Sequence, residues 1–514
     1  MSARQRGTPQ DDKAGAHLEL LEALGHTVPR ALDIQRGRRI YVNRNLRLDE
    51  IDLVGFDMDY TLALYNQRNL ENLSIRCTLQ KLVEKRGYPE EILSLDYDYT
   101  FGLRGVVVDR QYGNIFKMDR YGHVGRVYHG RRLLDKDERH RLYRTQRIRL
   151  SLPRYAWIDT LFALPEAVMY AALVELVDSR EGPWNRGYSQ LWQDVRESID
   201  EAHRDETMKR VIKSRMSEYI IRDPDLAPTL HKLRSSGKRL FLLTNSAWDY
   251  TDPVMSYLLD NALPAYPSWR SYFDIVVVSG GKPAFFTEKR PFIEIDAAGQ
   301  PKGVHTGPFV RGRIYEAGNI VDFEEMAGGG GDRVLYIGDH IYGDMLRAKK
   351  SSVWRTAMIL QELEQELEAV ERNKDKIARL DTLERQRNRL DSEIAYQQHL
   401  LRSLQRLDEI EERGISHDSA TVEAAKHEAK RRLDELRATM KATADEIAEL
   451  EKTLDHAFNP WWGEIFREGV ENSRFGEQVE DYACVYTSRV SNFLAYSPLR
   501  YFRSPRDYMP HELV

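Results

Sequence analysis

The stretch VGFDMDYTLALY (residues 54–65) joins an apolar run to two aspartates, Asp57 and Asp59, that stand one residue apart. The run at residues 53–56 is short and does not alternate with polar residues, which is typical of a strand buried on both faces of a parallel sheet. A solvated turn after this strand would explain one aspartate. Two carboxylates that repel each other, beside Thr61, indicate a site for a metal ion.

Three further apolar runs have the same character, at residues 240–243, 275–278 and 334–337. Helical stretches separate the runs, and this alternation predicts a doubly wound α/β sheet. In such a sheet ligands bind beyond the carboxyl ends of the strands. The four segments that follow the runs are all polar and read DMDYT, TNSAW, SGGKP and GDHIYGD. We therefore expect these segments to meet in one site.

Length, composition and net charge limit the classes of protein to which the chain could belong. The chain has 514 residues, 41% of them hydrophobic, which predicts a large domain with insertions or two to three domains. A net charge of −5 argues against a nucleic-acid surface. Cys77 and Cys484 cannot form a disulfide framework, and nowhere do about 18 apolar residues run together to cross a membrane. Because the start also has no apolar leader, we expect a cytoplasmic protein.

Two insertions interrupt the predicted core. Between the first and second strands lie residues 104–130, which alternate and turn like β-hairpins, and residues 161–220, which are spaced like helices. Later in the chain two arms of heptad-spaced apolar residues flank Gly414, which predicts an antiparallel helical hairpin with charged, solvated outer faces. The predicted parts are a flexible tail at 1–34, a catalytic core at 35–75 and 225–360, a cap over the strand ends at 76–224, the helical hairpin at 361–456, and a C-terminal segment that returns to the core at 457–514.

The four strand-end segments together hold the parts needed for phosphoryl transfer. Asp57 would be the nucleophile on phosphorus, and Asp59 would protonate the leaving oxygen and later accept a proton from water. Mg²⁺ would balance the charge of Asp57 and Asp59, with Asp339 as a third carboxylate and Asp344 behind it. The groups that would contact the phosphate oxygens, and assist the reaction, are Thr244, Asn245, Ser246 and Lys282.

These segments resemble the signatures of the haloacid dehalogenase superfamily, which are DxDxT, a Thr/Ser-Asn pair, an isolated lysine and GDxxxxD. From about residue 35 to the C-terminus the chain is also similar to the cytosolic purine 5′-nucleotidases. This resemblance implies a haloacid dehalogenase-like core and a Mg²⁺-dependent hydrolase of purine nucleoside 5′-monophosphates, with IMP and GMP preferred. The segments that carry it are YVNRNL (41–46), RGVVVDRQYGNIFKMDRYG (104–122), DTLFALPE (159–166), LTNSAWDYTDPVMSYL (243–258), LYIGDHIYGDMLRAKK (335–350) and MPHE (509–512).

The resemblance assigns the purine contacts to the cap. Phe162 would stack on the base, and Arg196, Asp200, His203 and Lys209 would face the substrate. The spacing of residues 196, 200 and 203 independently places them on one face of one helix. A surface helix with ordinary charge pairs, such as Arg196 with Asp200, explains the same pattern without a ligand.

The resemblance further implies an effector site for purine nucleotides and a homo-oligomer, either a tetramer or a dimer. The positions that match the effector site are Tyr342, Lys350, Gln478 and Tyr482. Asp159 stands where animal members of the family carry asparagine, and a carboxylate there would repel an anionic effector.

Two other functions remain open. The phosphoryl group on Asp57 could pass to another nucleoside, which would make the protein a nucleoside phosphotransferase, and no residue separates this reaction from hydrolysis. The protein could instead be a nucleotide-sensing scaffold with vestigial catalysis, but the core aspartates and Lys282 are intact, which weighs against this hypothesis. In each case the expected partners are small purine nucleotides rather than nucleic acid or a membrane.

Overall fold

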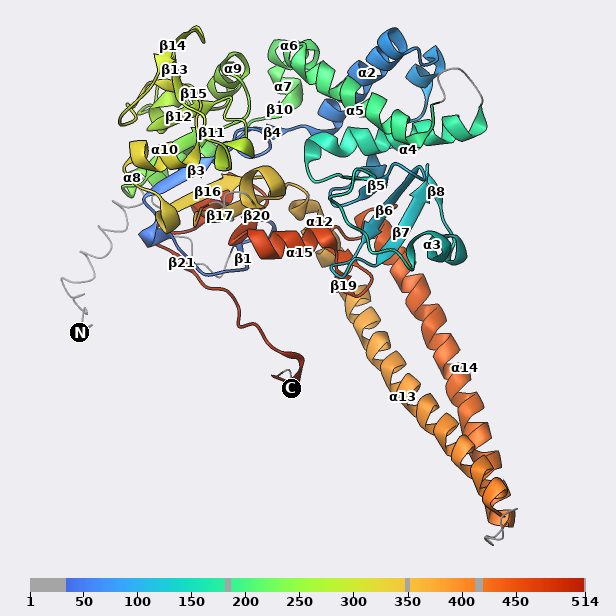
Figure 1. Cartoon of the computed structure of the whole chain (residues 1–514). Helices are drawn as coiled ribbons and strands as arrows, with labels where there is room; N and C mark the ends of the chain where they lie inside the picture. The colour runs from blue at the N-terminus through green and yellow to red at the C-terminus, as the bar shows by residue number, and fades with distance from the viewer. Residues whose placement is uncertain (1–33, 181–185, 347–351, 412–418, 513–514) are drawn as a thin grey trace, which may run out of the picture. The chain divides into compact units, whose positions relative to one another are not determined.

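The four apolar runs of the sequence form neighbouring strands of one sheet in the computed structural model of the protein (Figure 1). In spatial order they are β16 (Val334–Gly338), β3 (Leu53–Phe56), β11 (Arg239–Leu243) and β12 (Ile275–Val278), and each pairs with the next in parallel. Nearly all of their residues are buried. The sheet confirms the predicted doubly wound α/β fold.

The sheet extends beyond these four strands on both sides. On one side follow β17 (Arg355–Ile359), β20 (Val485–Thr487) and the antiparallel β1 (Tyr41–Val42). On the other side the parallel β15 (Ile314–Ala317) is followed by an antiparallel hairpin. The strands of this hairpin are β13 (Phe292–Ile295) and β14 (Pro301–Val304). Because β20 lies between β17 and β1, the sheet unites strands from opposite ends of the chain.

Packing on the two faces of the sheet explains why its strands lack polar alternation. Phe241 of β11 lies in one apolar cluster with Phe323 of α10 (Ile320–Ala327), and their ring centroids are 4.8 Å apart. Leu242, which points to the opposite face, is also fully buried. Each such side chain stabilises the fold by roughly 1.5–3 kcal/mol. In β3 a Cβ on Gly55 would lie 2.0 Å from the Phe241 ring, so only glycine fits there.

The residues between β3 and β11 contribute the predicted α+β cap. A five-stranded antiparallel sheet has the order β8-β7-β6-β5-β9, and α5 packs against α2 and α4. The predicted boundary between core and cap, at residues 75–76, falls inside α2. The elements are α2 (Gln67–Arg86), β5 (Val107–Asp109), β6 (Asn114–Met118), β7 (Val124–His129), β8 (Arg132–Leu133), α3 (Lys136–Tyr143), β9 (Tyr155–Trp157), α4 (Leu164–Ser179), α5 (Tyr188–Arg204), α6 (Thr207–Ser214) and α7 (Met216–Tyr219).

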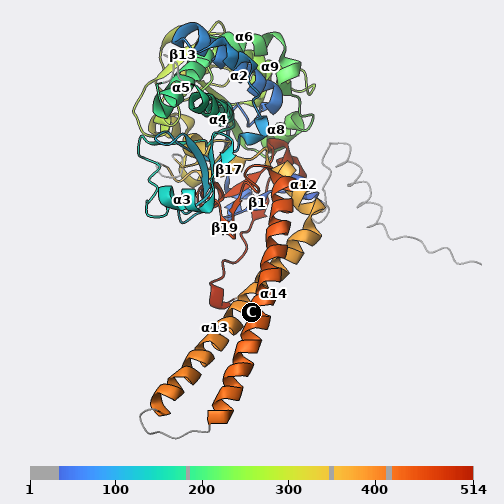
Figure 2. The same ribbon diagram turned by 90° about the vertical axis from the view of Figure 1, so that its right-hand side faces the viewer.

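The second insertion contains two long helices, α13 (Lys374–Glu411) and α14 (Ser419–Phe458), after the shorter α12 (Leu363–Arg372). Figures 1 and 2 show α13 and α14 side by side along their length. Arg379 pairs with Glu446 at 2.7 Å, and Glu393 lies 3.5 Å from Arg432, so residue numbers rise along one helix as they fall along the other. The two helices are therefore antiparallel, as the heptad pattern predicted. Gly414, in the predicted turn, lies outside the described residues.

The structure describes residues 34–180, 186–346, 352–411 and 419–512, so most of the predicted tail at 1–34 lies outside it. The chain divides into two compact units, one formed by residues up to 364 together with Gly469–Val514, and the other by Gln365–Glu468. Cys77 and Cys484 are both buried free thiols. Within the described ranges, no helix has the length and apolar composition needed to cross a bilayer.

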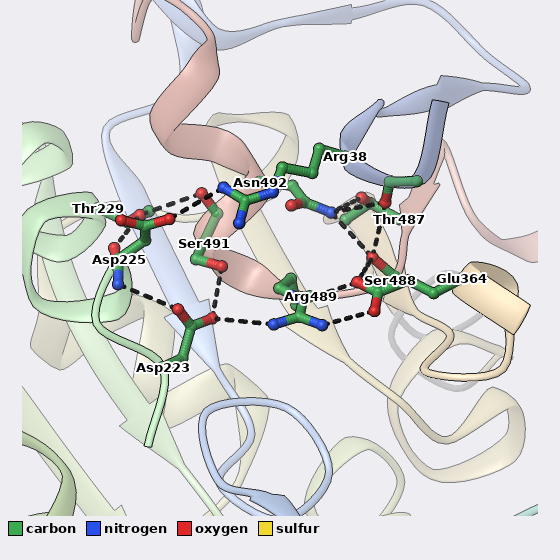
Figure 3. A network of polar contacts seen from close by, with 11 residues as sticks. Arg38, Asp223, Asp225, Thr229, Glu364, Thr487, Ser488, Arg489, Ser491 and Asn492 are labelled. Carbon is green, nitrogen blue, oxygen red and sulfur yellow. Dashed lines mark hydrogen bonds and ion pairs between the residues drawn. The ribbon is translucent and has the colours of Figure 1, made fainter. Parts of the chain in front are cut away.

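A polar network ties the C-terminal segment into the first unit (Figure 3). Arg489 donates two hydrogen bonds, of 2.8 and 2.6 Å, to the carboxylate of Glu364. Ser491 donates to Asp223 at 2.5 Å, and the side-chain amide of Asn492 donates to Thr487 Oγ1 at 2.8 Å. These contacts hold the chain at the end of β20 and in the residues that directly follow it.

Candidate active site

Asp57 is positioned by the end of β3. Its backbone N–H donates to the carbonyl of Ile337 in β16 at 2.9 Å, so the sheet hydrogen bonding continues to the aspartate itself. The backbone N–H groups of Leu62 and Ala63 then both donate to Met58 O at 2.9 Å and close a tight turn. This turn places Asp57 at the strand end with its side chain 13% exposed.

Lys282, which follows β12, reaches across the strand ends to Asp57. Its Nζ atom lies 3.0 Å from Asp57 Oδ2 and 2.7 Å from Asp344 Oδ1. Asn245, which follows β11, fixes the lysine backbone from both sides. Its Oδ1 accepts from Lys282 N at 2.6 Å, and its Nδ2 donates to Lys282 O at 2.9 Å. Segments that follow four different strands therefore meet around Lys282, as the sequence predicted.

Three carboxylates form a group that could hold a metal ion. Within the described part of the chain, oxygen atoms of Asp57, Asp339 and Asp344 lie within 4.8 Å of one another. Burial and, to a smaller extent, the Asp344 carboxylate raise the pKa of Asp57 to about 7 despite the opposing effect of Lys282. Burial and the same carboxylate also raise the pKa of Asp339 well above its usual range. The one ammonium that contacts this group does not balance its three carboxylates, and this deficit of positive charge suits a hard divalent cation.

A glycine allows Asp344 to fold back toward the strand end. Asp344 lies in the π-helical turn η9 (Ile341–Leu346), and the backbone N–H of His340 donates to its Oδ2 at 3.2 Å. A Cβ on Gly338 would lie 2.4 Å from that same carboxylate oxygen. The glycine of the GDHIYGD segment is therefore required by this close approach.

Asp59 occupies a different environment from the three-carboxylate group. Its Oδ2 accepts a hydrogen bond of 2.6 Å from the Ser246 hydroxyl, and its Oδ1 accepts one of 2.5 Å from Tyr65. The Tyr65 hydroxyl in turn lies 3.0 Å from that of Tyr250. Burial raises the pKa of Asp59, which favours the protonated form that a general acid needs. Its carboxylate is not part of the three-carboxylate group, so its role as a metal ligand stays a prediction.

The hydroxyl of Thr244 turns back on its own segment. Thr244 is fully buried and its Oγ1 accepts from the backbone N–H of Ser246 at 3.1 Å. Because Ser246 also binds Asp59, the Thr-Asn-Ser segment contacts both Asp59 and, through Asn245, Lys282.

The cap brings aromatic groups to the same strand end. Phe162, in the turn η5 (Leu161–Ala163), has its ring centroid 4.6 Å from that of Tyr60, which belongs to the DMDYT segment. His203 of α5 lies edge-on to Phe162 at 5.9 Å. Phe162 and His203, two of the five residues predicted to contact the purine, are thus next to each other, and Phe162 lies next to the turn that follows β3.

The charged cap residues form two groups. Arg196 Nη1 donates to Glu166 Oε1 at 2.7 Å, and its Nε lies 3.4 Å from Asp200. Lys209 of α6 pairs with Glu206 at 3.1 Å, and its ammonium lies 5.9 Å from the ring centroid of Tyr250. The predicted Arg196–Asp200 pair is present. The structure is therefore compatible both with a substrate-binding helix face and with an ordinary surface helix that carries charge pairs.

Sequence reasoning missed several residues of the site. Glu166 is buried, its Oε2 has no hydrogen-bond partner, and burial chiefly raises its pKa to about 7 despite Arg196. Tyr336 donates to a backbone carbonyl and accepts from Lys282, although it lies within an apolar strand. Arg104 is buried beside Asp339. All three residues lie within the segments that resemble the purine 5′-nucleotidases. Nothing in the local sequence pattern distinguished them from ordinary structural residues.

The residues predicted for an effector site lie on neighbouring elements. Tyr342 of η9 is 41% exposed, and α15 (Arg474–Tyr482), which carries Gln478 and Tyr482, packs against η9. Lys350 lies outside the described residues. Asp159 Oδ2 is 3.1 Å from His340 Nε2, and although burial opposes it, the Asp159 carboxylate helps to raise the pKa of His340 to about 9, so Asp159 has a cationic partner.

Comparison with known proteins finds similar chains along most of this sequence. A model of the 5′ nucleotidase family matches residues 40–514. A 5′-nucleotidase domain-containing protein of Dictyostelium discoideum is 28% identical over 483 residues, which is 92% of this chain and 74% of that protein. The human 5′-nucleotidase domain-containing protein 2 is 31% identical over 372 residues, which is 70% of this chain and 69% of the human protein.

Solved structures align with part of the chain. A predicted phosphoglycolate phosphatase from Haemophilus somnus covers 60% of this chain and 85% of its own, with 13% identity and a TM-score of 0.26. A 2-haloacid dehalogenase from Pseudomonas syringae covers 60% of this chain and 86% of its own, with 15% identity and a TM-score of 0.21. The fold class follows from the strand order and not from these alignments.

Proposed function

The chain belongs to the 5′-nucleotidase family of phosphoric monoester hydrolases, and from this premise we propose that it is a Mg²⁺-dependent enzyme that prefers IMP and GMP. Family membership supports hydrolysis of nucleoside monophosphates to nucleoside and phosphate. The observation that carries the proposal is the meeting of the Asp57, Asp339 and Asp344 carboxylates with Lys282 at the carboxyl ends of parallel strands. This is the place where open α/β sheets bind their ligands.

The first step is attack by a carboxylate oxygen of Asp57 on the phosphorus of the substrate. A bond forms between this oxygen and phosphorus, while the bond from phosphorus to the nucleoside 5′ oxygen breaks. Asp59 donates its proton to the leaving 5′ oxygen, which gives a neutral nucleoside. The 3.0 Å contact from Lys282 to Asp57 Oδ2 places positive charge beside the point where negative charge gathers in the transition state.

The second step hydrolyses the aspartyl-phosphate. Asp59, now ionised, takes a proton from water as the water oxygen attacks phosphorus, and the bond from phosphorus to Asp57 breaks. Phosphate leaves, and both aspartates return to their starting states. The hydrogen bonds from Ser246 and Tyr65 hold the Asp59 carboxylate in one orientation for both proton transfers.

The donor set fits Mg²⁺. This ion prefers carboxylate oxygens and keeps several waters, and Asp57, Asp339 and Asp344 would hold it here. When bound, Mg²⁺ supplies positive charge that neutralises phosphoryl oxygens. It would also lower the raised pKa of Asp57, so that the nucleophile is ionised at neutral pH.

The preference for 6-oxopurines is proposed from the cap. Phe162 and His203 lie together beside the catalytic turn, where they would contact the base. Arg196 can donate to a carbonyl oxygen on the purine, and Asp200 can accept from its ring N–H. Adenine presents an amino group and an unprotonated nitrogen at this edge, so neither side chain would find its hydrogen-bond partner on the base.

Phosphate release from a panel of IMP, GMP, AMP and pyrimidine monophosphates, with Mg²⁺ and with a chelator, tests the proposal. We expect turnover of IMP and GMP that stops when the chelator removes the metal. Turnover that is insensitive to the chelator would contradict the metal site. Absence of activity on every nucleotide would contradict the function itself.

A further inference from the structure

Three acceptors surround the ammonium of Lys282. Besides Asp57 Oδ2 at 3.0 Å and Asp344 Oδ1 at 2.7 Å, the hydroxyl of Tyr336 lies 2.7 Å from Nζ. A protonated lysine has three N–H donors, so each donor has one acceptor. The lysine side chain is 2% exposed, so water does not compete for these donors.

The Tyr336 hydroxyl is itself held by the sheet. Tyr336 lies on β16, and its hydroxyl donates to the carbonyl of Leu243, the last residue of β11, at 2.9 Å. The hydroxyl also lies 3.5 Å from Asp344 Oδ1, but the shorter bond to Leu243 uses its hydrogen, so its lone pair can accept from Lys282. The ring is fully buried and packs against Phe241 and Trp354, so the hydroxyl cannot move away.

The direction of this third hydrogen bond matters because the other two acceptors are carboxylates with different tasks. Asp57 is the proposed nucleophile, whereas Asp344 is proposed only to help hold the metal ion. An ammonium held only by two carboxylates can turn toward either. The Tyr336 hydroxyl removes this freedom by occupying the remaining donor.

We propose that Tyr336 is a positioning residue, whose hydroxyl holds the Lys282 ammonium against Asp57 at the point that the transferring phosphoryl group approaches. This inference rests on the proposed hydrolase and adds a residue to its machinery. It predicts that loss of one hydroxyl, deep in the apolar core, impairs the transition state more than it impairs substrate binding.

The test compares Tyr336→Phe with wild type in steady-state kinetics on IMP and in the Kd of orthovanadate, a pentavalent phosphate mimic. We expect kcat to fall about tenfold, KM to stay within about threefold, and the vanadate Kd to rise about tenfold. The matched control is Tyr315→Phe, because Tyr315 is a fully buried tyrosine of the same sheet whose hydroxyl accepts from Val310 N at 2.9 Å. This control should leave all three values within about twofold of wild type.

A double-mutant cycle tests whether Tyr336 acts through the lysine. In a Lys282→Met background, Tyr336→Phe should cause no further change in vanadate Kd, because the ammonium it positions is gone. An active wild type with unchanged kcat and vanadate Kd in Tyr336→Phe would overturn the inference and leave the hydrolase standing. If Tyr336→Phe weakened vanadate binding equally in the wild-type and Lys282→Met backgrounds, the inference would also be overturned. A wild type that neither releases phosphate nor binds vanadate would overturn the hydrolase and the inference together.

Discussion

Arg104 Nη1 donates to the backbone carbonyl of Asp339 at 2.9 Å, so a residue of the cap supports the loop that carries a proposed metal ligand. The same guanidinium makes two hydrogen bonds of 2.6 Å to Glu362, and its side chain is fully buried. It also lies 5.2 Å from the ring centroid of Phe475. A planar group with this many partners fixes the loop beneath Asp339 in one position.

Substitution Arg104→Lys should therefore weaken Mg²⁺ binding. Lysine keeps the charge but cannot pair with Glu362 and reach the Asp339 carbonyl at once. We expect the Kd for Mg²⁺, measured by calorimetry without substrate, to rise about tenfold. Arg154→Lys is the matched control, because Arg154 makes a similar double contact with Asp109 at 2.8 and 2.6 Å within the cap sheet. An equal rise in both variants would show that only general stability had changed.

Substitution Asp57→Asn should abolish turnover while the protein stays folded, because asparagine keeps the shape but is not a nucleophile. The expected loss in kcat is at least about a thousandfold. Thermal unfolding should show a folded variant. Phosphate release above a few per cent of wild type would remove Asp57 from the role of nucleophile.

Substitution Asp339→Ala should raise the Mg²⁺ concentration needed for half-maximal rate, and high Mg²⁺ should restore part of the rate. The substitution removes one of the three carboxylates proposed to hold the ion, while the proposed nucleophile remains. Rate measured against Mg²⁺ concentration gives the result. An unchanged Mg²⁺ dependence would place Asp339 outside the metal shell.

Base selectivity should depend on Arg196. We expect kcat/KM for IMP to exceed that for AMP at least about tenfold, which corresponds to one or more unpaired polar groups in the AMP complex. Arg196→Ala should narrow this gap, chiefly through loss of IMP turnover. Equal kcat/KM for the two nucleotides in the wild type would contradict the assignment of α5 to base recognition, but not the chemistry at Asp57.

The stability of the protein should depend on pH through Glu71 of α2. Glu71 is 4% exposed, and burial raises its pKa from 4.5 to about 7. The folded state therefore keeps a proton that the unfolded state has lost, and stability falls as pH rises between these two values. Glu71→Gln removes this cost, which is at most about 3 kcal/mol above pH 7. The variant's gain in Tm over wild type should grow from pH 5 to pH 8, and an equal gain at both pH values would contradict this origin.

Much of the fold was predictable because apolar runs mark strands that are buried on both faces. The runs at β3, β11, β12 and β16 have this character, and their alternation with helical stretches predicted the doubly wound sheet. The strands β17 and β20 were not predicted. The sequence RTAMI of β17 mixes polar and apolar residues, and β20 has only three residues, so pairing with distant strands decides their structure.

In the site, charged residues that directly follow a strand were predictable from the sequence. Residues that contact them from inside the fold were not. Asp57 and Lys282 are conspicuous because a charge after a buried strand is unusual. Tyr336 reads as one more apolar residue of its strand, and Arg104 reads as a surface charge. Their function depends on which backbone carbonyl or ammonium lies opposite, and this is a property of the tertiary structure alone.

The position of β20 between β17 and β1 has a consequence for biosynthesis. Ribosomes deliver β1 early and β20 only after the cap and the helical hairpin, so the nascent chain must carry an incomplete sheet through most of translation. During that time β17 presents an unpaired edge, which is the kind of backbone surface that chaperones shield and that aggregates recruit. A premature stop before residue 485 removes the last parallel strand and leaves this edge open for the lifetime of the truncated protein. Completion of the central sheet therefore depends on a strand that lies close to the C-terminal end of the chain.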